Sequence, residues 1–253
     1  MQRRPFDMSQ ALASSVPGRL VRGGRRLARH VGRGLLDVLY PPRCLACQAR
    51  LSRARAPLCA ACVAGLERAP SEVARQRLHA LPSGSGTAIA AVFPLWRFDP
   101  DGALRALQHA LKYQNRPRYG RAAGRWMGRA LAETLSPPPE AVVPVPLHRT
   151  RKLERGYNQS ARLARGVAER LGVPCRPGWL ERPHPTRSQT HLSRQARWEN
   201  VDGAFSASQS LDGRPLLLVD DVLTTGATGA AAARALRHAG AGPVYLATLA
   251  MAE

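Results

Sequence analysis

Strands and helices alternate along the C-terminal half of the chain. Three mainly apolar runs, "AVVPVPL", "RPLLLVDDV" and "GPVYLATLAM", predict strands that begin near residues 141, 214 and 242. Two stretches with helical spacing, "NQSARLARGVAERLG" and "TGAAAARALRHAG", predict helices that end at Gly172 and Gly240. This alternation predicts an α/β fold, in which helices flank a parallel sheet.

The middle of the chain predicts one more strand and two more helices. The strand is "TAIAAVFPLW", and the helices are "DGALRALQHALKY" and "YGRAAGRWMGRALAETL". In the first helix Leu104, Leu107 and Leu111 recur at helical spacing, so we expect them on its buried side.

These patterns divide the chain into four parts. Residues 1–34 carry many arginines and several glycines that weaken any helix, so we expect a basic, flexible extension. A cysteine-bearing segment follows at 35–68, and a polar linker at 69–86. We expect the α/β domain to occupy residues 87–253.

The cysteine-bearing segment predicts a small zinc ribbon. It holds two CxxC pairs, Cys44 with Cys47 and Cys59 with Cys62, separated by eleven residues. Two such knuckles place four thiolates around one tetrahedral ion, which closes the coordination shell and indicates a structural zinc. Redox-active CxxC pairs or disulfides are the alternative. Cys175 stands apart, and we expect it to be a small buried residue.

An acidic pair follows the most hydrophobic strand. Leu216 to Val219 are all apolar, which predicts a strand buried on both faces, and Asp220 and Asp221 come where we expect it to end. Ligands of open α/β sheets bind at that edge. Two adjacent carboxylates there can accept hydrogen bonds from neighbouring hydroxyls, such as those of a ribose.

A Thr/Gly loop after the acidic pair opens the next predicted helix. Its members are Thr224, Thr225, Gly226, Ala227 and Thr228. Small residues, hydroxyl donors and a helix N-terminus together suit a phosphate. A plain helix cap is the alternative, although a cap needs only one such residue. The stretch resembles the phosphoribosyl pyrophosphate (PRPP) motif of type I phosphoribosyltransferases, in which the acids bind ribose hydroxyls and the loop binds the 5-phosphate.

A basic segment follows the strand near residue 141. We expect it to form a pyrophosphate-binding loop with His148, Arg149, Arg151, Arg155, Gly156, Asn158 and Gln159. Lys152 adds a further positive charge. The alternative is a solvated basic loop.

A polar stretch from 184 to 205 shows no helical or strand period, and we expect a flexible lid over the ligand. Its candidate ligand-binding residues are Arg187, Gln189, Arg194, Arg197 and Asn200. The alternative is an ordinary surface loop.

The composition leaves the partners open. The net charge is +21, with 38 basic and 17 acidic residues, and 36 of the basic residues are arginine. Such a charge suits a polyanionic partner such as nucleic acid, but the arginine bias is also typical of a GC-rich genome. We find no apolar run long enough for a transmembrane helix and no secretion signal. We therefore expect a cytoplasmic protein, with peripheral attachment at the inner face of the membrane as the alternative.

These motifs, taken in order, resemble the ComF family of competence proteins. The matching stretches are "YPPRCLAC", "LCAAC", "LKY", "VPLHRTRKLERGYNQS", "RSQTHLSRQARWENVDGAF" and "LLLVDDVLTTGATG". The resemblance covers about residues 35 to 252. It implies a type I phosphoribosyltransferase-like sheet with flanking helices, preceded by a small four-cysteine zinc ribbon.

The resemblance also implies a function. We expect a protein that binds PRPP with magnesium, or a related phosphoribose or nucleic-acid phosphate. It would assist the uptake of single-stranded DNA in natural transformation, together with DNA-uptake proteins. One alternative is an active phosphoribosyltransferase in which Asp220 and Asp221 are catalytic and Trp96 or Tyr113 stacks on the acceptor. A zinc-dependent DNA-binding module with a vestigial pocket is the other.

Overall fold

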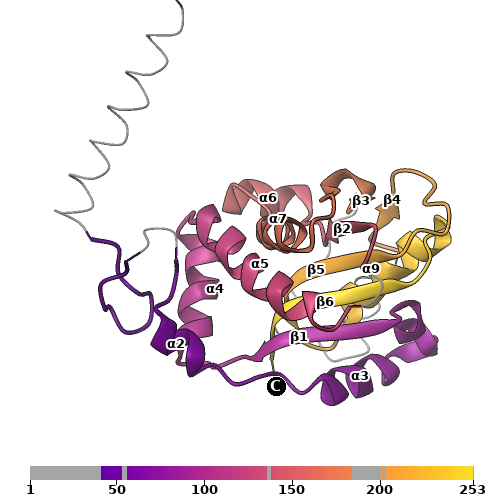
Figure 1. The fold of residues 1–253 in the computed structure, drawn as a ribbon. Helices are drawn as coiled ribbons and strands as arrows, with labels where there is room; N and C mark the ends of the chain where they lie inside the picture. The colour runs from indigo at the N-terminus through magenta and orange to yellow at the C-terminus, as the bar shows by residue number, and fades with distance from the viewer. Residues whose placement is uncertain (1–40, 53–55, 136–137, 184–200, 202, 253) are drawn as a thin grey trace, which may run out of the picture. The chain divides into compact units, whose positions relative to one another are not determined.

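The computed structural model describes residues 41–52, 56–135, 138–183, 201 and 203–252 (Figure 1). The chain divides into two units, Met1–Pro42 and Arg43–Glu253, and every helix and strand that the structure describes lies in the second. The predicted N-terminal extension, 1–34, lies outside the described residues. So do the five polar residues predicted for the lid.

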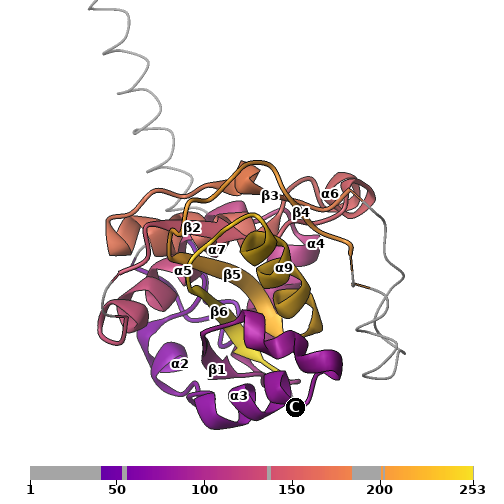
Figure 2. The same ribbon diagram turned by 90° about the vertical axis from the view of Figure 1, so that its right-hand side faces the viewer.

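A four-stranded parallel sheet forms the centre of the second unit (Figures 1 and 2). Its order is β1-β6-β5-β2, and the strands are β1 (Ala91–Arg97), β2 (Ala141–Pro144), β5 (Leu216–Leu223) and β6 (Val244–Met251). β5 lies between two other strands, and its first four residues are fully buried. The predicted α/β class and the central position of this strand are therefore confirmed.

Helices cover both faces of the sheet. On one face α4 (Ala103–Tyr113), α5 (Pro117–Ala132) and α7 (Gln159–Leu171) pack against Leu217, Val219, Ala247 and Leu249. On the other face α3 (Ser71–His79) and α9 (Ala227–His238) pack against Leu216, Leu218 and Leu246. The odd and even positions of the strands thus face different layers, as the pleat of a β-strand requires.

Helices α5 and α7 approach each other closely through glycines. A Cβ atom at Gly124 would lie 2.0 Å from the carbonyl oxygen of Leu163, and one at Gly166 would lie 2.2 Å from that of Arg121. Because neither helix carries a side chain at these positions, the two backbones come into direct contact. This contact fixes α7, which begins beside the acidic pair.

Short elements complete the described chain. They are α2 (Ala60–Ala64), η1 (Pro82–Ala88), α6 (Arg149–Arg155), η2 (Pro177–Trp179), β3 (Leu180–Glu181) and β4 (Ser206–Ala207). None of the helices within the described ranges combines the length and the apolar character needed to cross a bilayer.

Three segments differ from the prediction. The expected linker, 69–86, contains helix α3, whose Ala74 and Leu78 are buried in the core, so this segment is part of the packed unit. The expected basic loop contains the short helix α6. Strand β5 does not end at the acidic pair, because it continues to Leu223 in parallel pairing with β6.

The sheet contains a topological switch point between β2 and β5. These strands are neighbours, but β2 is followed by α7 on one face and β5 by α9 on the opposite face. Connections that diverge in this way leave a crevice at the carboxyl ends of the two strands, where ligands of open α/β sheets bind. We call it the switch crevice.

Candidate functional site

The acidic pair lies in the switch crevice, on the C-terminal half of β5. Asp220 Oδ1 accepts a hydrogen bond from Ser160 Oγ at 2.8 Å and another from the backbone N–H of Asp221 at 2.9 Å. Asp221 Oδ2 forms an ion pair with Lys112 Nζ at 3.3 Å. Helices α7 and α4 therefore each provide one side chain that contacts the acidic pair.

Asp220 has an unusual protonation equilibrium. Burial, followed by the negative charge of Asp221, raises its pKa to about 7, although the hydrogen bond from Ser160 and the charge of Lys112 act in the opposite direction. A carboxyl with a pKa near neutrality can accept or donate a hydrogen bond at physiological pH. Such shifts are concentrated at functional sites.

The Thr/Gly loop joins β5 to α9 as predicted. Gly226 is the N-cap of α9 in the left-handed conformation with φ +88°, and a Cβ there would lie 2.4 Å from a methyl group of Leu78. The N–H of Ala227 donates to Thr225 Oγ1 at 3.3 Å. A helix of this length presents a partial positive charge at its N-terminus, so this end of the crevice suits an anion.

A small cavity of about 20 Å³ lies between this loop and Asp220. Asp220, Thr224, Gly226, Thr228 and Thr248 are among the residues that line it. The hydroxyl of Thr248 is buried and has no hydrogen-bond partner within the described part of the chain. Thr248 is the register partner of Asp220 on β6, so its position follows from sheet pairing. The sequence does not single out Thr248 as a site residue, because pairing between distant strands leaves no local signal.

The basic segment follows β2 along the chain and contains the short helix α6. His148 caps α6 by accepting a hydrogen bond from Thr150 N at 3.4 Å, and Arg149, Arg151 and Arg155 lie on that helix. Arg151 also forms an exposed ion pair with Glu154 at 3.4 Å. Arg149 and Arg151 are exposed and Arg155 is half-buried, and all three lie on a helix and not on a loop.

The residues after α6 have mainly structural contacts. Gly156 ends α6 with φ +73°, in the left-handed region that favours glycine. Asn158 caps α7 by accepting from Ser160 N at 3.0 Å and donates to Val145 O at 2.9 Å. Gln159 is 1% exposed, so its amide faces the interior.

A larger basic cavity of about 820 Å³ lies beside α6 and α7. Its basic lining residues are Arg149, Lys152, Arg162, Arg165 and Arg182, together with one acid, Glu181. The charge of Asp220 also acts on Arg182, which connects this cavity electrostatically to the acidic pair. An anionic group extending from the switch crevice would meet this surface.

The two aromatic residues expected to stack on an acceptor have different environments. Trp96 is 4% exposed and packs edge-to-face on Trp126 with ring centroids 5.7 Å apart, so the stacking role proposed for it is wrong. Tyr113 is 70% exposed at the end of α4 and directly follows Lys112. Of the two, Tyr113 is the ring that remains available.

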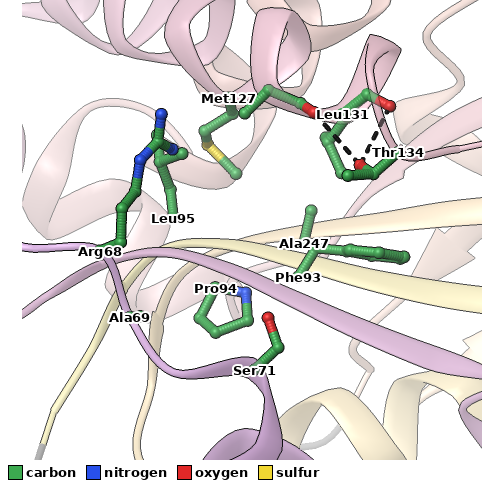
Figure 3. Close-up of a pocket in the computed structure, with 11 residues that line it drawn as sticks. Arg68, Ala69, Ser71, Phe93, Pro94, Leu95, Met127, Leu131, Thr134 and Ala247 are labelled. Carbon is green, nitrogen blue, oxygen red and sulfur yellow. Dashed lines mark hydrogen bonds between the residues drawn. The ribbon is translucent and has the colours of Figure 1, made fainter.

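A second pocket, of about 180 Å³, lies away from the acidic pair (Figure 3). Phe93, Leu95, Met127 and Leu131 give it a mainly apolar wall, with Arg68 at one side. It contains none of the predicted site residues, so it contributes nothing to the candidate site.

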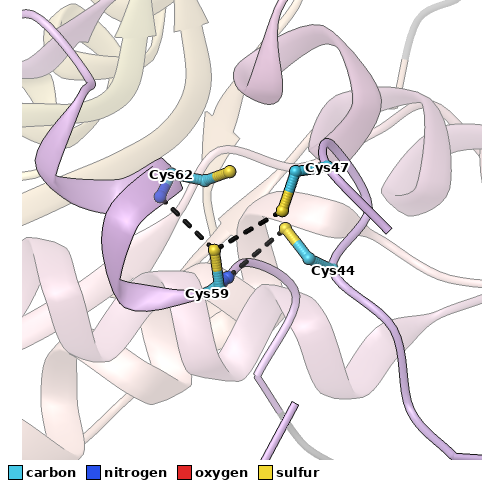
Figure 4. A group of neighbouring side chains, drawn as sticks. All are labelled: Cys44, Cys47, Cys59 and Cys62. Atoms are coloured by element: carbon cyan, nitrogen blue, oxygen red, sulfur yellow. Dashed lines mark hydrogen bonds between the residues drawn. The ribbon is translucent and has the colours of Figure 1, made fainter. Parts of the chain in front are cut away.

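The four cysteines of the two CxxC pairs converge (Figure 4). Their sulfur atoms all lie within 4.8 Å of one another, and the Sγ atoms of Cys47 and Cys59 are 3.7 Å apart. Zn–S bonds of about 2.3 Å at tetrahedral angles separate two sulfurs by about 3.8 Å, whereas a disulfide would bring them to about 2 Å. The geometry fits one structural zinc ion with four thiolate ligands, as predicted.

Backbone donors support the thiolate form of Cys44. The N–H of Cys59 points at Cys44 Sγ at 3.4 Å, and that of Cys62 at Cys59 Sγ at 3.4 Å. Burial raises the pKa of Cys44, but backbone hydrogen bonds from Cys47, Cys59 and Ala46 outweigh it and lower the value to about 6. Cys175 lies elsewhere, packed beside the α5–α7 core, and burial raises its pKa.

The cysteine cluster is packed against the α/β domain. Cys44 and Leu58 share a small buried cluster with Ala103, the first residue of α4, and Trp126 of α5 packs against it. The ribbon therefore supports the beginning of the helix that carries Lys112 at its other end.

Comparisons with known proteins agree with these features. Residues 35–74 match the family model described as a double zinc ribbon domain. The chain has five cysteines, of which four form the cluster, so it can hold one four-cysteine site.

The relatives include proteins named for DNA utilization and for competence. The chain is 35% identical over 147 residues to a DNA utilization protein of Salmonella typhi, covering 56% of this chain and 65% of the relative. It is 38% identical over 105 residues to competence protein F of Haemophilus influenzae, covering 40% of this chain and 46% of the relative. The chain thus spans less than two thirds of the length of these relatives. These homologues confirm the predicted resemblance to the ComF family.

The solved structures with partial likeness include two phosphoribosyl enzymes. A glutamine PRPP amidotransferase from B. subtilis has a TM-score of 0.36 and 25% identity, covering 51% of this chain and 26% of that one. An adenine phosphoribosyltransferase from Leishmania tarentolae has a TM-score of 0.32 and 15% identity, covering 59% and 76%.

Proposed function

We propose that this protein binds PRPP, or a related phosphoribose or nucleic-acid phosphate, in the switch crevice, and that it assists the uptake of single-stranded DNA in natural transformation. One observation carries the proposal. The crevice places the carboxyl group of Asp220 beside the Thr/Gly loop at the N-terminus of α9, and Asp221 follows it on β5. Carboxylates accept hydrogen bonds from sugar hydroxyls, and a helix N-terminus binds phosphate, so together they match a ribose 5-phosphate.

The described residues suggest how each part of the ligand would be held. The 5-phosphate would lie at the Thr/Gly loop, where Gly226 keeps the backbone open to an anion. The ribose hydroxyls would face Asp220 and Asp221. The pyrophosphate would extend towards the positive charges of α6 and its cavity, where Arg149 provides a guanidinium. The predicted lid residues, at 187–200, would complete this side.

Magnesium would accompany the pyrophosphate. Carboxylate and phosphate oxygens are the ligands that this ion prefers, and its charge would neutralise the leaving pyrophosphate. Asp221 is already paired with Lys112, so the ion would be held mainly by the pyrophosphate oxygens.

The DNA role rests on the relatives. The matched proteins are named for competence and for DNA utilization, and a net charge of +21 suits a protein that works beside nucleic acid. The zinc ribbon would act as a structural support. The direct test is a transformation assay on a strain with Asp220→Ala and Asp221→Ala together. Loss of transformants at normal protein level supports the proposal, and a normal frequency separates the crevice from DNA uptake.

A phosphoribosyltransferase is the second candidate function. The exposed ring of Tyr113 favours it, because this ring follows Lys112 directly and can stack on a base brought to the crevice. Phosphoribosyl transfer depends mainly on electrostatic positioning, which the acidic pair and the basic cavity would supply. Pyrophosphate release from PRPP on addition of candidate bases or amines tests this activity.

A further inference from the structure

Lysine is rare in this chain. Of 38 basic residues only Lys112 and Lys152 are lysines. Lys112 contacts Asp221, and Lys152 lines the basic cavity beside α6. Arginine supplies almost all of the other positive charges. At position 112 the protein therefore has an ammonium group where most of its basic positions have a guanidinium group. The two differ physically, because ammonium is a compact point charge and guanidinium a wide planar fork.

The ammonium of Lys112 is held between two oxygen atoms. It lies 3.3 Å from Asp221 Oδ2 and 3.4 Å from Gln108 Oε1. The side chains of Lys112 and Asp221 are only 24% and 19% exposed, which separates this pair from the surface ion pairs of the protein. Partial burial strengthens such a contact, because water screens it less.

The fold fixes this position. Leu104, Leu107 and Leu111 anchor α4 in the core, as predicted from their spacing. The hydroxyl of Tyr157 donates a buried hydrogen bond to the carbonyl oxygen of Leu111, the residue before Lys112. Burial raises the pKa of Tyr157 to about 12, so the hydroxyl remains a donor at all physiological pH values. The end of α4 is therefore tied to the segment between α6 and α7.

We propose that Lys112 is a built-in cation of the acidic pair: its ammonium group occupies the position at Asp221 that a divalent cation would otherwise take. The inference deepens the proposed function and rests on it for the identity of the ligand. Any magnesium would then arrive on the pyrophosphate, and the carboxylates would remain available to the ribose hydroxyls. The occupancy of this position by Lys112 can be tested without PRPP.

The chemistry of the pair supports this reading. Two adjacent carboxylates are the kind of oxygen donors that Mg²⁺ and Mn²⁺ bind. An ammonium in contact with one of them repels a second cation and occupies one of its oxygens. Among the described residues, Arg182 also interacts electrostatically with Asp220. Removal of the Lys112 charge should therefore leave Asp221 open to a metal ion.

Manganese binding tests the inference directly. Free Mn²⁺ is measured by electron paramagnetic resonance during titration of the zinc-loaded full chain. Lys112→Gln should bind Mn²⁺ at least about ten-fold more tightly than the wild type, as expected when a unit charge beside the ligand oxygens is removed. Arg105→Gln is the matched control, since it removes one charge from an exposed ion pair on the same helix. Adding Asp221→Asn to Lys112→Gln should abolish the gain.

Equal Mn²⁺ affinity of the wild type and Lys112→Gln, with unchanged zinc content and melting temperature, would overturn the inference. A measurement on the wild type covers the case in which the variant does not fold. In NMR spectra, the protein labelled at lysine ¹³Cε gives two lysine signals. The signal that disappears in Lys152→Arg belongs to Lys152, and the other belongs to Lys112. Low Mn²⁺ should broaden the two signals similarly. Selective broadening of the Lys112 signal would mean that a metal binds beside the ammonium, which contradicts the inference.

The two proposals fail in different ways. If PRPP does not bind, calorimetry with PRPP shows it, and the manganese results are unaffected. If Lys112 is not the built-in cation, the manganese results show it whether or not PRPP binds.

Discussion

The hydroxyl of Ser160 donates a hydrogen bond of 2.8 Å to a carboxylate oxygen of Asp220. It joins the first turn of α7 to β5, an inner strand of the sheet. Because α7 is fixed by its close contact with α5, this hydrogen bond sets the orientation of the carboxyl group before any ligand arrives. The site is therefore preorganised, which lowers the cost of ordering it on binding.

Removal of the Ser160 hydroxyl should weaken ligand binding. In Ser160→Ala the pKa of Asp220 should rise further, because the hydrogen bond favours the ionised form. PRPP affinity measured by calorimetry near neutral pH should fall about ten-fold, the usual effect of losing one hydrogen bond to a charged group. Ser210→Ala is the matched control, since Ser210 donates a similar bond to the exposed Asp212. Equal losses in both variants would contradict this role.

The raised pKa of Asp220 predicts a pH-dependent gain in stability for Asp220→Asn. The pKa of the carboxyl rises from 3.8 to about 7 on folding, so its protonated form favours the folded state. The contribution of this carboxyl to the stability of the fold is fully present below its pKa in the unfolded chain and is lost as the pH rises through about 7. The variant should therefore gain more in melting temperature at about pH 8 than at about pH 5. Asp101→Asn, at an exposed site, should show no such trend. A gain that is independent of pH would refute the prediction.

Gly226 should tolerate no side chain. Its φ of +88° disfavours other residues, and an added Cβ would overlap the Leu78 side chain at 2.4 Å. Gly226→Ala should lower the free energy of unfolding by about 2 kcal/mol, measured by denaturant titration. Gly178→Ala should be nearly neutral, because nothing lies within 4 Å of its Cβ position and its φ is not positive. Similar effects at the two positions would argue against the left-handed N-cap of α9.

The cysteine cluster should hold about one zinc ion per chain and support the domain beside it. Cys59→Ser should lose the zinc and lower the melting temperature, since Cys44 and Leu58 pack against the beginning of α4. Cys175→Ser should keep the zinc, because Cys175 lies outside the cluster. Zinc content by atomic emission and thermal melting measure both. A zinc-free protein with an unchanged melting temperature would show that the ribbon supports nothing.

The sequence predicted the parts of the site that lie on continuous segments. The acidic pair and the Thr/Gly loop follow an unbroken apolar strand, so their position at the carboxyl edge could be inferred from pattern alone. Lys112 and Thr248 could not be placed in this way, because both are far from Asp220 in the sequence. Lys112 lies 108 residues before it, on helix α4, and Thr248 lies 28 residues after it, on the neighbouring strand β6. Trp96 was predicted at the site and is in the core, since Trp126 covers it.

The segment before β1 was the least predictable part of the fold. It is mainly polar, and only a few apolar residues, Ala74 and Leu78 among them, are buried. Those few contacts suffice because α9 presents a nearly continuous surface of alanines on the same face of the sheet. A polar sequence can therefore form a packed helix when its partner supplies the apolar surface.

Calorimetric titration of PRPP with magnesium into the zinc-loaded full chain tests the central claim most directly. The account predicts saturable binding to the wild type and none to Asp220→Ala with Asp221→Ala, while both proteins keep their zinc and remain folded. Failure of the wild type to bind, or equal binding by the double variant, would contradict the claim that the acidic pair of β5 binds a phosphoribose.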